Sequence, residues 1–358
     1  MILNFPLEES FNIAASKFCG LDCYLITPQI DAKWNKNNLF YRSLIADKDG
    51  NVLSSGFPKF FNHGEKGECY PDPDEFNDWK CEDKIDGSLL IADYVNGQFS
   101  MRTRGTVSYL AQPNAGDFEL LPKKYPKVLE FLKENQHLSL LFEIVTPNNV
   151  IVVRPSEIDF FLLGSINKRG MCVVSSADLT NIWRKVGPIP APQSYNFLDT
   201  KSLSKIAESI KSWKGKEGIV VSYNNGQNRI KLKSDWYLFC HRVKSQLNSQ
   251  NNLIEYYIDS EMPSHESFYK KIEADFDFEI AFQLKKEIEK ICNSGEKARK
   301  YIDNILEMVH DIRKVESRKE QAEMIKRHYN ENPAYAFSIL DNKPISKTQW
   351  TKLINNFL

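Results

Sequence analysis

The sequence predicts a mixed α+β domain followed by an all-helical domain. Short runs rich in β-branched and aromatic residues recur through roughly the first 240 positions. Turn signals such as Asp49-Gly50 and Asn96-Gly97 separate these runs. From about Leu247 the strand-like runs stop, and long Lys/Glu-rich stretches with helical spacing begin. A chain of 358 residues is comfortable for two domains, which we place at 1–246 and 247–358.

The expected strands are short apolar runs that lie between turn signals. They cover residues 39–46, 88–95, 140–146, 149–153, 159–166, 218–223 and 229–234. Apolar residues at three- and four-residue intervals predict helices instead. These helices cover residues 124–135 and 202–213 in the first domain, and 280–291 and 298–328 in the second.

The composition is that of a packed, soluble protein, with 42% hydrophobic and 26% charged residues. Lys+Arg and Asp+Glu both number 47, so a nucleic-acid binder with this net charge must gather its cations locally. No apolar run is long enough to span a bilayer, and MILNFPLEES lacks the features of a secretory signal. Cys19 and Cys23 are the closest of 7 cysteines, and no second pair completes a zinc site. These features favour free thiols and a cytoplasmic location, the host cytoplasm for a viral protein.

The first of five ordered motifs is Lys84-Ile85-Asp86-Gly87-Ser88. A lysine attacks phosphorus only as the neutral amine, and burial or nearby cations lower a lysine pKa from its usual value near ~10.4. Asp86 can hydrogen-bond a sugar or orient the loop, and Gly87 allows a nucleotide to approach the backbone. The alternative is an exposed lysine before an Asp-Gly turn.

The second and third motifs supply a cation and a carboxylate. Arg102 to Thr106 offers the Arg104 guanidinium to a phosphate, or else forms a solvated turn. Leu141 to Pro147 places Glu143 inside an apolar strand-like run, where a carboxylate is costly unless paired or metal-bound. Strand alternation also allows Glu143 to lie on a wet face.

The last two motifs follow the same logic. Lys216 to Val221 sets Glu217 and Gly218 before a buried strand. Lys231 and Lys233 are two apart in a strand, so they point the same way, toward one anion or along a charged edge strand. Together the five motifs provide an amine nucleophile, two carboxylates for a divalent cation and cations for phosphates, which is the chemistry of nucleotidyl transfer.

This order of motifs resembles the covalent nucleotidyltransferase superfamily of ligases and capping enzymes. The runs FPKFFN at 57–62, FEIVTPNNVIVV at 142–153 and IKLKSDWY at 230–237 are similar to the first-type RNA ligases of T-even bacteriophages. The similarity covers residues from about 40 to 245. It implies an adenylyltransferase domain with antiparallel sheets, followed by an all-helical C-terminal domain.

The resemblance also implies roles for matching residues. Lys84 would accept AMP, and Glu143 and Glu217 would help to hold the metal. The nucleotide would be bound by Arg42 at the sugar, Lys59 at the triphosphate, Lys231 and Lys233 at the phosphates, and by Asp86, Gly87, Arg104 and Gly218. Arg104 stands where the phage enzymes have lysine, which keeps the charge but changes its geometry. Phe160 and Phe161 lie in the strand that corresponds to the adenine-stacking one.

The implied activity is ATP-dependent RNA ligation, with Mg²⁺ as the metal and Mn²⁺ as a substitute. Its substrates would be RNA 5′-phosphate and 3′-hydroxyl ends, with nicked tRNA among them, and the expected state is a monomer without a membrane partner. A DNA ligase or an mRNA capping enzyme is the main alternative, but both append an OB-fold after the KxK motif. The others are an inactive RNA-binding relic and an end-repair enzyme with a fused P-loop kinase, whose GxxxxGK[ST] loop is missing.

Overall fold

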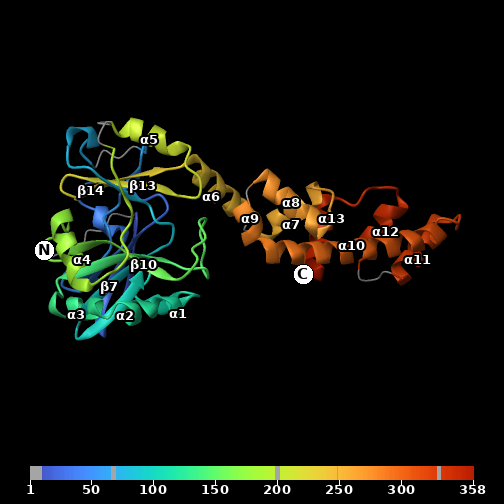
Figure 1. Cartoon of the computed structure of the whole chain (residues 1–358). Coiled ribbons are helices and arrows are strands. Elements are labelled where there is room, and N and C mark those ends of the chain that lie inside the picture. The colour runs from blue at the N-terminus through green and yellow to red at the C-terminus, as the bar shows by residue number, and fades with distance from the viewer. Residues whose placement is uncertain (1–9, 66–69, 198–201, 248, 277, 329–331) are drawn as a thin grey trace. The chain divides into compact units, whose positions relative to one another are not determined.

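The computed structural model describes residues 10–65, 70–197, 202–247, 249–276, 278–328 and 332–358. The chain forms two compact units, Met1–Phe239 and Cys240–Leu358. Figure 1 shows that the first unit mixes sheets with helices and that the second is helical. The predicted fold class is therefore confirmed. The division between the units falls inside helix α6 (Asp235–Leu247).

Three sheets build the first unit. The first sheet has the order β1-β2-β3-β4 and contains Phe11–Phe18, Leu21–Pro28, Leu44–Asp47 and Val52–Ser55. The second has the order β11-β10-β9-β7-β8 and contains, in chain order from β7, Ser88–Val95, Gln98–Thr103, Leu138–Val145, Asp159–Asn167 and Cys172–Val173. The third has the order β12-β6-β13-β14-β5 and contains, in chain order from β5, Phe61–Asn62, Lys80–Asp83, Ser194–Tyr195, Gly218–Tyr223 and Asn228–Lys233.

Strand pairing in these sheets is antiparallel, apart from the short parallel pair of β14 with β5. The hairpin signals are confirmed, because Asn96 and Gly97 have positive φ and join β7 to β8. Asp49-Gly50 lies between the antiparallel strands β3 and β4.

Helices cover the second and third sheets of the first unit. The short helices are α1 (Ala115–Phe118), α2 (Leu120–Lys124), and the 3₁₀ turns η1 (Leu39–Arg42), η2 (Pro73–Glu75) and η3 (Tyr109–Ala111). Helices α3 (Lys127–Glu134) and α4 (Ser176–Val186) bury apolar side chains with the inner face of β7, β9 and β10. Helix α5 (Leu203–Lys211) does the same for the third sheet. The opposite faces of these two sheets are therefore left to build a site.

The second unit consists of helices in the part of the chain that the structure describes. They are α7 (Gln250–Asp259), α8 (His265–Asp275), α9 (Phe278–Gln283), α10 (Lys285–Ile312), α11 (Arg318–His328), α12 (Pro333–Leu340) and α13 (Lys347–Phe357). The long helix α10 packs against α7, α8, α12 and α13. Tyr257 of α7 lies so close to Gly295 of α10 that a Cβ there would meet its ring at 2.5 Å, so a glycine permits this packing.

One predicted strand is correct only in its second half, and another is wrong. Residues 39–42 form the 3₁₀ turn η1, and the strand begins only at Leu44. Residues 149–153 form no strand, because the amides of Val152 and Val153 donate to the Asp86 carboxylate instead of to a neighbouring strand. The other predicted strands are confirmed as β7, β9, β10, β13 and β14. Within the first unit, the predictions left out strands β1, β2, β4, β5, β6, β8, β11 and β12 and helices α1, α2 and α4.

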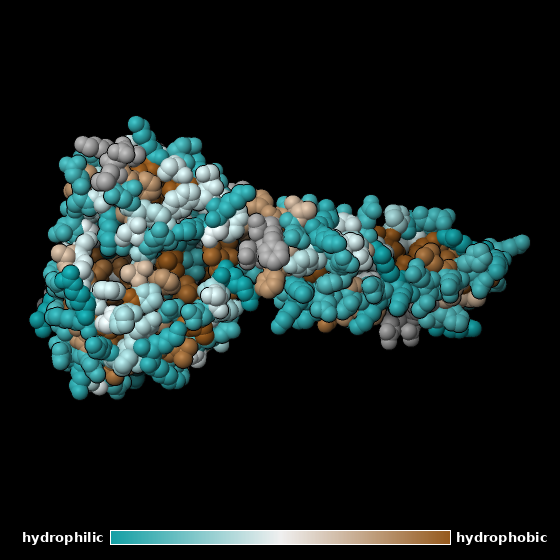
Figure 2. Space-filling view, in the orientation of Figure 1, coloured by the Kyte–Doolittle hydropathy of each residue, from teal (hydrophilic) through white to brown (hydrophobic). Residues whose placement is uncertain are grey.

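The surface and the thiols match an ordinary globular chain. Figure 2 shows a mostly hydrophilic surface on the visible face of the first unit, with apolar residues in its hollowed middle. Six cysteines are free thiols, and Cys69 lies outside the described residues. Within the described ranges, no helix has both the length and the apolar character that a bilayer crossing requires.

Candidate active site

A cavity of about 540 Å³ opens in the first unit between the second and third sheets. Its wall comes from strands that are far apart in the sequence, namely β6, β7, β8, β9, β10, β13 and β14, together with η1. Seven of the predicted site residues line it, namely Arg42, Lys84, Gly87, Arg104, Glu143, Lys231 and Lys233. Phe57, Leu163 and Val220 add an apolar wall, so one cavity offers both apolar surface and cations, as nucleotide sites do.

Lys84 directly follows β6, and its amide donates to the Gly218 carbonyl at 2.9 Å. This pairing of β6 with β13 brings Lys84 beside Glu217. Glu217 is 3% exposed, and its two oxygens accept from Lys84 Nζ at 2.8 Å and pair with Lys233 Nζ at 2.9 Å. One buried carboxylate therefore orients two cavity lysines, and the exposed-lysine alternative for Lys84 is wrong.

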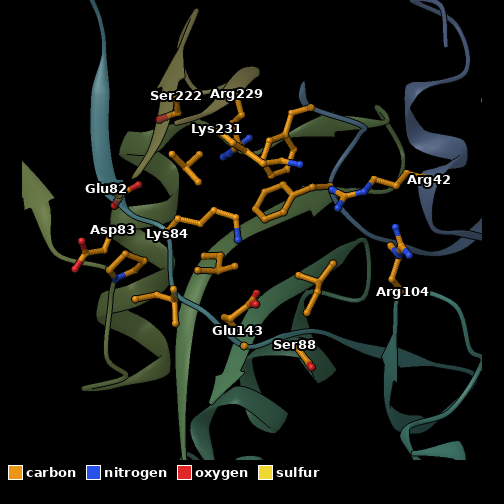
Figure 3. Close-up of a pocket in the computed structure, with 18 of the residues that line it drawn as sticks. Arg42, Glu82, Asp83, Lys84, Ser88, Arg104, Glu143, Ser222, Arg229 and Lys231 are labelled. Carbon is orange, nitrogen blue, oxygen red and sulfur yellow. The ribbon is translucent and has the colours of Figure 1, made fainter. Parts of the chain in front are cut away.

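Glu143 lies on β9 and faces the cavity below Lys84 in Figure 3. Burial raises the pKa of its carboxyl to about 7, the nearby Lys84 lowers it, and Glu217 and Asp86 raise it further. A carboxylate this poorly compensated attracts a cation. Glu143 therefore remains available to a metal ion, while both oxygens of Glu217 are held by lysines.

Lys231 points into the cavity from β14, and in Figure 3 it extends toward the space that Lys84 also enters. Its Nζ lies 4.8 Å from the centre of the Phe60 ring, while the Arg42 guanidinium is 5.2 Å from the same ring. Burial lowers the pKa of Lys231 to about 7, and Arg42, Lys59, Lys84 and Lys233 lower it further. Because these like charges repel one another, an anion bound beside Lys231 would stabilise its charged form.

Arg42 and Arg104 stand on one side of the cavity, opposite Glu82 and Asp83 (Figure 3). Burial lowers the pKa of Arg42 to about 10, and the charge of Arg104 lowers it further. Within the described ranges neither guanidinium makes an ion pair with an acid. The pair is therefore left for a bound anion.

Lys59 does not line the cavity. Its Nζ lies 3.5 Å from Glu65 Oε1 and 4.7 Å from the centre of the Phe61 ring. Its charge nevertheless helps to lower the pKa of Lys231, so Lys59 acts electrostatically on a residue that lines the cavity.

Three predicted residues shape the backbone behind the cavity. Asp86 accepts from the amides of Val152 and Val153, both at 2.7 Å, and from the Tyr237 hydroxyl at 2.8 Å. Of the two roles considered for Asp86, the structure supports loop orientation. A Cβ on Gly87 would meet the Ile144 carbonyl oxygen at 2.3 Å, and one on Gly218, where φ is +143°, would meet that of Leu232 at 2.0 Å.

The structure removes two further alternatives. Strand β14 pairs with β13 on one side and with β5 at Ile230 and Lys231 on the other, so Lys231 does not lie on an open sheet edge. Arg102 is fully buried on β8, so the reading of its motif as a solvated turn is wrong at that position. After Lys233 the described residues contain only helices, which argues against the OB-fold of DNA ligases and capping enzymes.

Sequence analysis did not predict several of the residues that line the cavity. Arg229 lies two positions before Lys231 on the same strand face, so the alternation that paired the two lysines also pointed to it. Neither Phe160 nor Phe161 lines the cavity. Phe160 is in the core against α3 and α4, and Phe161 lines a smaller cavity with Asp86. Leu163 lines the main cavity instead, where a register shift interrupts β10.

A family model described as RNA ligase matches residues 41–246, more than half of the chain. The chain belongs to the RNA ligase family. A protein of Thermovibrio ammonificans with a provisional RNA ligase name is 24% identical to this RNA ligase family member over 213 residues. The match covers 57% of this chain and 53% of that protein, so the chain spans about half the length of this curated relative.

Two kinds of solved structure are similar to this family member. An archaeal ATP-dependent RNA ligase aligns with 15% identity and a TM-score of 0.49, covering 79% of this chain and 76% of that one. The Naegleria gruberi RNA ligase with PPi aligns with 15% identity and a TM-score of 0.40, covering 46% and 52%.

Proposed function

We propose that the chain is an ATP-dependent RNA ligase whose nucleophile is Lys84. The observation that carries the proposal is the cavity itself. It brings the Lys84 amine, a cluster of cations around Lys231 and the Glu143 carboxylate, which forms no ion pair among the described residues, into one space. The apolar wall suits a nucleobase, and the cations suit a triphosphate.

In the first step the neutral amine of Lys84 attacks the α-phosphorus of ATP. The N–P bond forms as the bond to pyrophosphate breaks, and the amine proton leaves to solvent. Glu217 holds Lys84 in place, because one of its oxygens accepts from Nζ at 2.8 Å. Lys231 and Lys233 stabilise the charge that develops on the phosphate. Arg42 and Arg104 would neutralise the leaving pyrophosphate, a different role for Arg42 from the sugar contact that the resemblance implied.

A divalent cation fits this donor set. Magnesium takes one or two carboxylates together with substrate phosphates, and Glu143 and Glu217 supply two carboxylates beside the phosphate site. When bound, Mg²⁺, or Mn²⁺ in its place, would act as a Lewis acid on the α-phosphate. Glu143 is the residue we assign as its direct ligand, since it carries no lysine partner among the described ion pairs.

Two further displacements at phosphorus complete the reaction. The 5′-phosphate of an RNA attacks the phosphorus of lysyl–AMP, which breaks the N–P bond, releases Lys84 and forms an RNA-adenylate. The 3′-hydroxyl of a second end then attacks the 5′-phosphate of this RNA-adenylate, which forms the phosphodiester and releases AMP and a proton. The same cations serve both steps, since each transition state develops charge on phosphate oxygens.

Labelling with radioactive ATP tests the nucleophile. We expect the wild-type protein to retain AMP label after denaturation and Lys84→Ala to retain none. Lys216→Ala is the control, since Lys216 lies on the neighbouring strand end and pairs with Asp83 rather than with Glu217. Label that persists on Lys84→Ala would show that another residue is the nucleophile.

We further propose that the helical unit selects RNA and takes no part in the chemistry. Some of its cations brace helices, as Arg318 pairs with Asp341. Lys297 and Lys300 of α10 and Lys326 and Arg327 of α11 are exposed, and none of them forms an ion pair with another described residue. Exposed, unpaired cations are suited to a phosphate backbone.

Truncation after Asn248 tests this division of labour. The truncated protein should still form lysyl–AMP, but it should lose its preference within a panel of labelled 5′-phosphate RNAs and DNAs that includes nicked tRNA. Ligation of nicked tRNA above the other ends would support a role in RNA repair. A truncated protein that stays folded by circular dichroism and forms no lysyl–AMP would make the helical unit part of the catalytic machinery.

A further inference from the structure

Arg102 is a charged side chain with no exposed surface, and it lies on β8 two residues before the cavity residue Arg104. Burial lowers its pKa to about 10, so it stays charged at neutral pH. Its Nε donates to Ser54 Oγ at 2.7 Å, and Ser54 donates in turn to the buried Asp93 carboxylate at 2.5 Å. Asp93 therefore supplies the counter-charge through one serine hydroxyl.

The other end of the Arg102 guanidinium is bound to Ser43. Nη1 donates to Ser43 Oγ at 2.8 Å, and Nη2 donates to the Ser43 carbonyl at 3.2 Å. Ser43 Oγ donates its own proton to the Arg104 carbonyl at 2.8 Å. Since Ser43 also follows Arg42 in the chain, its one hydroxyl ties together the backbones that carry both cavity guanidiniums.

Such a tie is needed because Arg42 and Arg104 repel each other. The charge of Arg104 lowers the pKa of Arg42, and no described acid forms an ion pair with either. Without a fixed backbone, the guanidinium groups of Arg42 and Arg104 would move apart. The binding of a triphosphate would then have to bring them together again, at a cost in affinity. A backbone held by buried hydrogen bonds avoids this reorganisation.

We propose that Ser43, held by Arg102, is a positioning residue that preorganises Arg42 and Arg104 for the phosphates of ATP. The inference rests on the proposed function, since it takes ATP as the ligand. Ser43 does not line the cavity and acts through Arg104, whose carbonyl accepts its hydroxyl proton.

The test measures ATP binding by calorimetry in a Lys84→Ala background, so that binding is not followed by adenylylation. Ser43→Ala should weaken ATP binding about five- to tenfold, the effect of one lost hydrogen bond in a binding constant. The matched control is Ser165→Ala. Ser165 is also fully buried, and its hydroxyl also donates to a backbone carbonyl, that of Ser139 at 3.0 Å. We expect this control to bind ATP within twofold of its parent and to lose a similar amount of thermal stability.

A double-mutant cycle separates positioning from general damage. In an Arg104→Ala background, Ser43→Ala should change ATP affinity less than twofold, because the guanidinium through which it acts is gone. An undiminished effect in that background, equal losses in Ser43→Ala and Ser165→Ala, or unchanged binding in Ser43→Ala would each overturn the inference. Absence of AMP label on the wild-type protein would instead overturn the proposed function, and absence of ATP binding would overturn both.

Discussion

Replacing Glu217 by glutamine tests whether one carboxylate organises the nucleophile. Glu217 is 3% exposed, and each of its oxygens meets a different lysine, at 2.8 Å for Lys84 and 2.9 Å for Lys233. Glutamine keeps the size of the side chain but offers only one acceptor oxygen. Its NH₂ group must then face an ammonium group, so one charge-assisted bond is lost and the other becomes a bond to a neutral acceptor.

The magnitude follows from these contacts. A hydrogen bond to a charged group contributes about 1.5–3 kcal/mol, and the weakened second bond loses about half of that. Glu217→Gln should therefore lower the free energy of unfolding by about 2–4 kcal/mol. If the carboxylate also supports metal and transition-state charge, lysyl–AMP formation should slow by about 10²–10³-fold.

Two measurements check this prediction. Urea denaturation gives the loss of stability, and single-turnover labelling with radioactive ATP gives the rate. Glu208→Gln is the control, because Glu208 forms an exposed pair with Lys211 and should change stability by less than about 1 kcal/mol. A Glu217→Gln protein as stable as the wild type, with the wild-type labelling rate, would refute the role of Glu217 as the residue that holds both lysines.

Three more predictions concern the phosphate site and the strand beside it. Lys231→Ala should block lysyl–AMP formation more severely than the sealing of pre-adenylylated RNA, and a gel assay of both reactions will show whether the two losses differ. Because the pKa of Lys231 is about 7, its amine is mostly neutral above pH 7 when no anion is bound. The phosphates of ATP should raise this pKa toward its ordinary value of 10.5, so ATP binding at pH 8 should take up a proton. Calorimetry in buffers of different ionisation enthalpy measures this uptake, which should vanish in Lys231→Met. Gly218→Ala should cost about 3 kcal/mol or more in urea denaturation, since its φ is +143° and the new Cβ would meet the Leu232 oxygen, whereas Gly116→Ala meets nothing and should change stability by less than about 1 kcal/mol.

Much of the site was predictable because its functional residues lie in short strand segments, where the direction of each side chain follows from the local sequence. A two-residue period places Lys231 and Lys233 on one face, and that holds in β14 whatever the rest of the chain does. An isolated carboxylate in an apolar run, such as Glu143, signals a partner before any partner is known. These local rules were sufficient to select the cavity lysines and the carboxylate that faces them.

Predictions failed where a side chain replaced a regular backbone partner. The run 149–153 has strand composition, but Asp86 takes the amides that a strand would have used. Phe161 and Leu163 share the same alternation on β10, yet Leu163 lines the main cavity and Phe161 lines a smaller cavity with Asp86. Neither event has a signal within a few residues, because both depend on contacts between distant segments.

The sequence by itself determined the fold class, the order of the motifs and the identity of the nucleophile candidate Lys84. Periodicity and residue chemistry act over a few positions, so they can be read without a structure. Only the tertiary structure decided that Glu217 joins Lys84 to Lys233, that Asp86 serves the loop, and that Ser43 links the two cavity arginines. Those arrangements rest on hydrogen bonds between residues up to 151 positions apart, and no local pattern specifies which distant donor meets which acceptor.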